Sequence, residues 1–231
     1  MAIDSTSADR PDHALVLVAH GTDNPAGRRV ITDLRDLVAA QLPQVRVLDA
    51  YVDVQQPALD DTMKMLASEG IPTVVVPLLL SAGYHMQVDV ADAVAGHPAA
   101  VAATSLGPHP LLAEVLADRL VAAGADRNGP VVCAVAGSAR AEGALDAEQA
   151  ASYLQEVWGG PVSVGYLSAA TPSVAEALAG QPGAAVASYL IGPGFFHDRL
   201  RALDAVVTDP LGADARIAAL VVDRYRTLAG R

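Results

Sequence analysis

The chain carries the same series of four short segments twice, and this internal repeat restricts its fold more than any other feature of the sequence. The first segment, VLVAHGTDNPAG, returns about 116 residues later as CAVAGSARAEG. The other matched pairs are AYVDVQQPALDD with GYLSAATPSVAE, VVVPLLLSAGYH with VASYLIGPGFFH, and SLGPHPLLAEVLADRL with PLGADARIAALVVDRY. We therefore predict a polar N-terminal tail (1–13), an N-terminal domain (14–124) and, after a linker near 124–129, a C-terminal degenerate repeat domain (130–231).

Within each copy, short apolar runs rich in β-branched residues alternate with stretches whose apolar residues recur at helical spacing. In the first copy we expect strands at 14–19, 45–51, 73–80 and 101–106, and helices from Pro25, over 57–69, up to 95 and over 108–122. This alternation is typical of βα units. The predicted fold is α/β, with two tandem flavodoxin-like modules, each a roughly four-stranded parallel sheet flanked by helices, and a cleft between them.

Composition excludes several classes of protein. With 52% hydrophobic and 18% charged residues, the chain can bury a core and is neither a disordered tail nor a disulfide-stapled miniature. A net charge of −11 disfavours binding to nucleic acid or to an anionic membrane. The polar N-terminus and the lack of a long apolar run favour a cytoplasmic protein without a membrane span. Two copies of the module in one chain favour a monomer. The single cysteine, Cys133, is expected in a buried strand.

Three residues with metal-binding chemistry follow the first three strands of the first copy: His20, Asp53 and His85. Because the carboxyl ends of parallel strands meet at one edge of a sheet, these side chains are expected to converge. Two imidazoles and a carboxylate with open positions suit Fe²⁺, Co²⁺ or Zn²⁺. In the second copy Ala136 replaces His20 and Ser168 replaces Asp53, while His197 matches His85. One module is therefore predicted to hold the site and the other to cover it.

For single residues, a purely structural role stays open as an alternative to metal binding. A lone histidine after a strand is often a cap, and Asp53 is placed as an ordinary turn residue would be. Asp89 could orient His85 or could be a solvated acid in the first helical turn. We predict that the other three histidines are surface residues: His13, His97 and His109.

Other catalytic and nucleotide-binding motifs are missing. The sequence contains no GxxxxGK, GxGxxG or GxSxG, so a bound nucleotide or a serine hydrolase is not expected. The segment VAHG is similar to the strand-end histidine of histidine phosphatases, but Ala19 stands where those enzymes have an arginine. Phosphoryl transfer is therefore a distant alternative.

Four segments of the first copy, LVLVAHGTDNP, AYVDVQQPAL, VVVPLLLSAGYHMQVDV and SLGPHPLLAEVLADR, resemble the successive signatures of the class II chelatases of the CbiX and SirB type. The second copy resembles the degenerate repeat of the long, two-domain form. The resemblance implies ATP-independent insertion of Co²⁺ or Fe²⁺ into sirohydrochlorin, an anionic tetrapyrrole, for cobalamin or sirohaem biosynthesis. It places the metal-binding histidines at His20 and His85, and the family's usual acidic residue, commonly Glu, at Asp53.

We expect His20 and His85 to deliver the metal and to take up the pyrrole protons. The substrate carboxylates need local donors because the protein is acidic, and the candidates are Thr22, Ser81, Gly83, His197, Arg28 and Arg140.

Two further classes of protein stay open as alternatives to a chelatase. A metal or tetrapyrrole carrier would bind without turnover, and a two-lobed sugar or nucleotide binding module would bind no Co²⁺ between the histidines.

Overall fold

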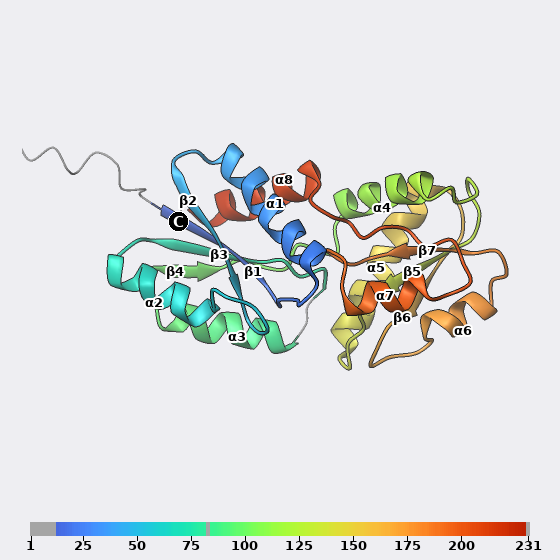
Figure 1. The fold of residues 1–231 in the computed structure, drawn as a ribbon, viewed down its shortest axis with the longest axis horizontal. Helices are drawn as coiled ribbons and strands as arrows, with labels where there is room; N and C mark the ends of the chain where they lie inside the picture. Colours follow the sequence, from blue (N-terminus) through green and yellow to red (C-terminus); the bar gives the residue numbers. More distant parts are fainter. Residues whose placement is uncertain (1–12, 82–83, 230–231) are drawn as a thin grey trace, which may run out of the picture.

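The computed structural model describes residues 13–81 and 84–229, with only the backbone for 84–87. It confirms the predicted α/β fold with two parallel sheets (Figure 1). The first sheet has the order β2-β1-β3-β4 and the second β6-β5-β7, so each first strand lies between the two that follow it. The strands are β1 (His13–Ala19), β2 (Val45–Tyr51), β3 (Thr73–Pro77), β4 (Ala100–Ala102), β5 (Val131–Val135), β6 (Val162–Tyr166) and β7 (Ala185–Ser188).

Helices cover both sheets, and their ends follow local sequence chemistry. The helices are α1 (Pro25–Gln41), α2 (Leu59–Glu69), α3 (Tyr84–Ala95), α4 (Pro110–Ala122), α5 (Ala141–Trp158), α6 (Val174–Ala179), α7 (Phe195–Arg201) and α8 (Ala215–Ala229). The Asn24 side chain caps α1 by accepting from the N–H groups of Ala26 and Gly27. Gly70 ends α2 with a φ of 68°, a conformation that glycine adopts without steric cost. No helix in the described part of the chain is long and apolar enough to cross a membrane.

The second sheet has three strands where we expected about four. The fourth strand is reduced to a single bridge between Val186 and Val207. Beyond this bridge, the Ser188 N–H donates to the hydroxyl of Thr208 rather than to a backbone carbonyl, at 2.9 Å. At this edge of the sheet, a side-chain hydroxyl therefore accepts the hydrogen bond that a backbone carbonyl accepts between paired strands. In the first sheet, β4 is likewise shorter than the strand predicted over 101–106.

The last helix of each copy packs on the lobe formed by the other copy. Helix α4, from the first copy, contacts α5 and β7, whereas α8, from the second copy, contacts α1 and β3 (Figure 1). Neither lobe therefore coincides with one of the segments 14–124 and 130–231, because each lobe contains the last helix of the other copy. Each segment gives its final helix to its neighbour, because the apolar face of that helix is covered there.

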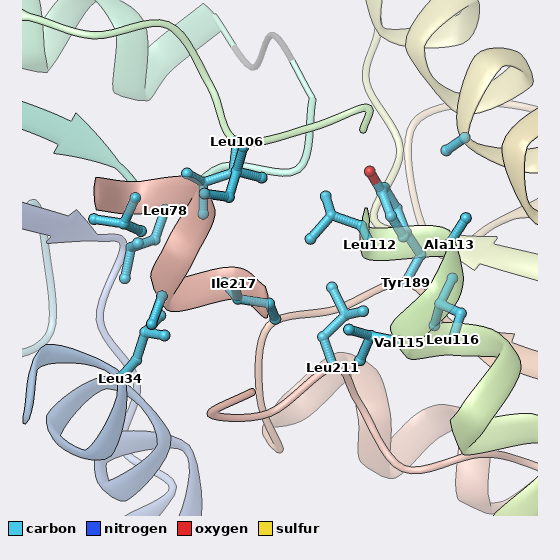
Figure 2. Packing of buried hydrophobic residues seen from close by; sticks show 14 of the residues in the cluster. Leu34, Leu78, Leu106, Leu112, Ala113, Val115, Leu116, Tyr189, Leu211 and Ile217 are labelled. Carbon is cyan, nitrogen blue, oxygen red and sulfur yellow. The ribbon is translucent and has the colours of Figure 1, made fainter. Parts of the chain in front are cut away.

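The exchanged helices join the two cores into one. A continuous cluster of buried apolar side chains includes Leu34 of α1, Leu116 of α4, Cys133 of β5 and Ile217 of α8. Figure 2 shows Ile217 between Leu34 on one side and Leu211 on the other. Smaller clusters lie on the opposite face of each sheet. The lobes are consequently fixed to each other by buried apolar contacts.

Candidate active site

His20 is the first residue after β1, and the two neighbouring strands bring their ends to it. The Asp53 N–H donates to the His20 carbonyl at 2.9 Å, which places the end of β2 on one side. On the other side, the Leu78 N–H beyond β3 donates to the Val18 carbonyl at 2.8 Å. The side chain of His20 is exposed. Parallel pairing thus sets this imidazole at the carboxyl edge of the sheet, where ligands of α/β proteins bind.

Two cavities meet at His20. The central cavity, of about 270 Å³, lies between the lobes and is lined by His20, Leu78–Leu79–Leu80–Ser81, Val135–Ala136–Gly137, Gly143, Ala147 and Tyr189–Leu190–Ile191. The side cavity, of about 190 Å³, is lined by His20, Thr22, Gly27, Gln55 and Pro193 among others. Both contain side chains from the two lobes, so His20 faces the cleft between them.

Matched residues of the two copies face each other across the central cavity. His20 and Ala136 both line it, as do Leu78 and its counterpart Leu190. The turns behind them are built alike, because Gly21 and Gly137 have φ values of 102° and 97°. A Cβ at either glycine would clash with the carbonyl of the matched residue, Asp53 or Ser168. The cleft therefore has one wall with an imidazole and an equivalent wall with a methyl group.

A family model described as CbiX matches residues 14–123 and again residues 130–228. The chain belongs to the CbiX family. This confirms the resemblance to class II chelatases, and the two matches cover both copies of the repeat.

Curated relatives of this CbiX-family protein include two sirohydrochlorin cobaltochelatases. That of Methanothermobacter thermautotrophicus is 27% identical over 89 residues, which are 38% of this chain and 62% of the relative. That of Sulfolobus acidocaldarius is 30% identical over 77 residues, which are 33% of this chain and 61% of the relative. The similarity thus spans about three fifths of each curated relative.

Solved structures described as SirB and CbiX share the fold over nearly their whole length. SirB from Bacillus subtilis with Fe³⁺ has a TM-score of 0.76 at 19% identity, covering 93% of this chain and 94% of that one. SirB from Bacillus subtilis subspecies spizizenii in complex with cobalt has a TM-score of 0.79 at 16% identity, covering 95% and 96%. The structure of CbiX described as the terminal enzyme of sirohaem biosynthesis in denitrifying bacteria has a TM-score of 0.68 at 20% identity, covering 94% and 99%.

The two other predicted metal ligands of this CbiX-family protein are less fully defined than His20. His85 lies in the first turn of α3, but its side chain is outside the described residues. The exposed carboxylate of Asp53 accepts from the Val54 N–H at 2.8 Å, the contact of a turn residue, and it lines neither cavity. Among the described side chains, no three His, Cys, Asp or Glu residues are grouped to hold a metal. Convergence of His20, His85 and Asp53 on one ion stays a prediction.

The predicted carboxylate-binding residues are dispersed around the cleft. Thr22 lines the side cavity and Ser81 the central one, whereas Gly83 lies outside the described residues. Arg28 donates to the Thr22 carbonyl at 2.7 Å and pairs with Asp23 at 3.2 Å, which keeps its guanidinium at the start of α1. Arg140 is an exposed residue directly before α5.

Two histidines of the chain are buried where the sequence suggested exposure. His197 is only 3% exposed, its Nε2 lies 3.1 Å from the Thr208 carbonyl, and it lines neither cavity, so it is not the accessible carboxylate donor that the sequence predicted. His97 is also 3% exposed, with its Nε2 3.1 Å from the Ile71 carbonyl, so it is not a surface residue. Each imidazole shares a buried backbone carbonyl with a hydroxyl, because Ser188 Oγ also donates to the Thr208 carbonyl and Thr73 Oγ1 also donates to the Ile71 carbonyl.

Sequence reasoning missed two polar residues of the cleft. The Gln55 side chain accepts from the Thr22 N–H at 3.3 Å and lines the side cavity beside His20. Tyr189 lines the central cavity, and burial raises the pKa of its phenol well above the usual range. The available signal was the repeat itself, because Tyr189 is a polar aromatic residue at the place where the first copy has Pro77.

Proposed function

We propose that this CbiX-family protein inserts a divalent metal, Fe²⁺ or Co²⁺, into sirohydrochlorin without a nucleotide cofactor. The observation that carries the proposal is His20 at the cleft between two matched lobes, with Ala136 at the equivalent position on the other wall. The names of the curated relatives support sirohydrochlorin as the substrate. The SirB structures with Fe³⁺ and with cobalt support the two metals.

A cleft with the imidazole of His20 on one wall and the methyl group of Ala136 on the other suits metal insertion. An imidazole can ligate a divalent cation, and it is also a base that works near neutral pH. Insertion needs both properties, because the metal must be held and released while two pyrrole N–H protons leave. The facing wall of Val135, Ala136, Gly143 and Ala147 offers apolar surface for the face of a macrocycle. We assign His20 and His85 to metal delivery and proton uptake, with Asp53 as a candidate third ligand.

Binding of an anionic tetrapyrrole by a protein of net charge −11 requires local donors. Thr22 and Ser81 line the cavities, and Arg28 and Arg140 lie at the starts of α1 and α5. Helix N-termini add backbone N–H groups and a positive dipole end. We propose that these groups hold the carboxylates at the cleft rim while the ring enters between the lobes. We also propose that the chain works as a monomer, since both walls of the cleft come from one polypeptide.

The test is anaerobic incubation of the protein with sirohydrochlorin and either Fe²⁺ or Co²⁺, followed by absorption over time. We expect His20→Ala and His85→Ala each to lower the insertion rate by about a hundredfold or more. His13→Ala is the matched control, because His13 begins the same strand that ends before His20, roughly 20 Å away. Full activity of both site variants would refute the mechanism. Binding of metal and macrocycle without turnover by the wild type would identify a carrier instead.

A further inference from the structure

Tyr189 makes a hydrogen bond across the cleft from one lobe to the other. It follows β7 in the second lobe, and its hydroxyl donates to the carbonyl of Leu80 in the first lobe at 3.2 Å. The tyrosine is only 4% exposed, so water does not compete for this bond. Tyr189 and Leu80 both line the central cavity with His20. The bond therefore lies in the cavity wall (Figure 2 shows the Tyr189 ring among the core residues).

The segment that Tyr189 holds is bonded to the first sheet just before this point. The Leu78 N–H donates to the Val18 carbonyl at 2.8 Å. The Leu79 carbonyl accepts from the N–H groups of Leu106 and Gly107 at 2.8 and 3.2 Å. At Leu80 the partner changes from the first lobe to the second. The bond of Tyr189 is thus the point at which this wall of the cavity is tied to the opposite lobe.

Gly107 leaves the space that this contact needs. A Cβ at Gly107 would clash with the hydroxyl oxygen of Tyr189 and would lie 2.5 Å from the Leu80 carbonyl oxygen. Neither atom can move freely, because one is on a buried ring and the other directly follows Leu79, whose carbonyl is hydrogen-bonded. A side chain at 107 would therefore separate the hydroxyl from its acceptor.

The matched residues of the two copies cannot form an equivalent bond in the opposite direction, from the first lobe to the second. In the repeat, Tyr189 matches Pro77 and Leu80 matches Gly192, and Pro77 has no hydroxyl to return the contact. Both copies need similar packing within their own lobes, so packing does not explain a hydroxyl in only one of them. The bond runs from the copy that lacks the histidine to the wall of the copy that has His20.

We propose that Tyr189 is a positioning residue for metal insertion, which sets the width of the central cavity by holding the Leu78–Ser81 wall beside His20 against the second lobe. This rests on the proposed function, since it assigns the part of Tyr189 in that reaction. The residue acts through Leu80 and takes no part in the chemistry itself. Removing its hydroxyl keeps the buried ring but releases the Leu80 carbonyl.

Three variants test the role of Tyr189 in kinetics: Tyr189→Phe, Gly107→Ala and the control Tyr166→Phe. Tyr166 is a buried tyrosine at the end of β6 in the same lobe, and it does not line the central cavity. We expect Tyr189→Phe and Gly107→Ala each to lower kcat by about tenfold, because cavity geometry changes while the metal-binding groups remain. The double variant should lose no more than either single variant, since both break one contact. Tyr166→Phe should keep kcat and KM.

Hydrogen exchange of the hydrogen-bonded amides next to Leu80, those of Leu78, Leu106 and Gly107, tests the bond without any activity assay. We expect faster exchange there in Tyr189→Phe and wild-type exchange in Tyr166→Phe. A wild-type protein that inserts no metal would refute the proposed function. Unchanged exchange at these three amides, or unchanged kcat and KM for Tyr189→Phe in an active protein, would overturn the role of Tyr189 alone.

Discussion

Arg119 and Arg224 occupy matched positions on the two exchanged helices, and each donates to a backbone carbonyl of the other copy. Nη2 of Arg119 on α4 lies 2.8 Å from the Leu211 carbonyl, and Nε of Arg224 on α8 lies 3.4 Å from the Ser105 carbonyl. The helices are also paired directly, because Arg216 on α8 contacts Asp118 on α4 at 2.8 Å. The two copies are therefore tied at the exchange by polar contacts as well as by the shared core.

These two arginines are expected to differ in their contribution to stability. The Arg119 contact is short and the residue is partly buried, with Nε fully shielded, so Arg119→Ala removes both a charged donor and packing of its stem. We expect a loss of about 2 kcal/mol in the free energy of unfolding for Arg119→Ala, and about 0.5 kcal/mol or less for Arg224→Ala with its long contact. Urea denaturation of both variants measures this. Equal losses would show that the contact lengths do not govern the stability.

Deletion of α8 is expected to unfold the first lobe, although this helix belongs to the second copy. Its buried residues are Ile217, Ala218, Leu220, Val221, Val222 and Tyr225. Their removal costs roughly 10 kcal/mol of apolar burial, which is comparable to the whole stability of a domain. Hydrogen exchange should therefore show lost protection in β1 and β3 of a chain ending at residue 213. Protection lost first in β5 and β6 would contradict the packing of α8 on α1 and β3.

The sequence predicted the elements better than their assembly. Local patterns sufficed for β2, whose predicted and observed ranges agree, and the repeat indicated that His20 and Ala136 are equivalent. Helical periodicity marks the apolar face of α8 but not the lobe that covers it, so the exchange was not predictable. His197 shows a second limit. The sequence placed it among the donors for the substrate carboxylates, yet its imidazole is buried against the Thr208 carbonyl, beside the single bridge that remains of the fourth strand.

Asp214, directly before α8, is expected to make stability depend on pH in acid. Hydrogen bonds from the Arg216 side chain, at 2.9 Å to each carboxylate oxygen, lower the pKa of Asp214 despite partial burial. The stabilisation is fully present above the usual carboxyl pKa and is lost as the pH falls from that value through the lowered one. Asp214→Asn should thus cost roughly 1 kcal/mol at pH 7, and the difference from wild type should shrink below about pH 4.

The matched control for Asp214 is Asp223→Asn. The Asp223 side chain is 69% exposed and lies 3.6 Å from Arg224, the geometry of a weak surface pair. Its free energy of unfolding should follow the wild type within a few tenths of a kcal/mol at every pH. A difference between Asp214→Asn and wild type that stays constant from pH 7 to pH 3 would rule out titration of Asp214 as the cause.

Gly27 is expected to be essential for seating the second lobe on α1 at the side cavity. It is buried in the first turn of α1, and a Cβ there would clash with the Pro193 carbonyl oxygen and lie 2.9 Å from Thr22 Cγ2. Alanine would gain up to about 1 kcal/mol from helix propensity, but overpacking typically costs about 1–3 kcal/mol, so the clash should prevail. Gly96→Ala is the control, because its nearest neighbour, the Ala93 carbonyl oxygen, would lie at 3.7 Å. Urea denaturation should show a loss for Gly27→Ala and none for Gly96→Ala, and equal stabilities would mean that residues 192–194 can yield without cost.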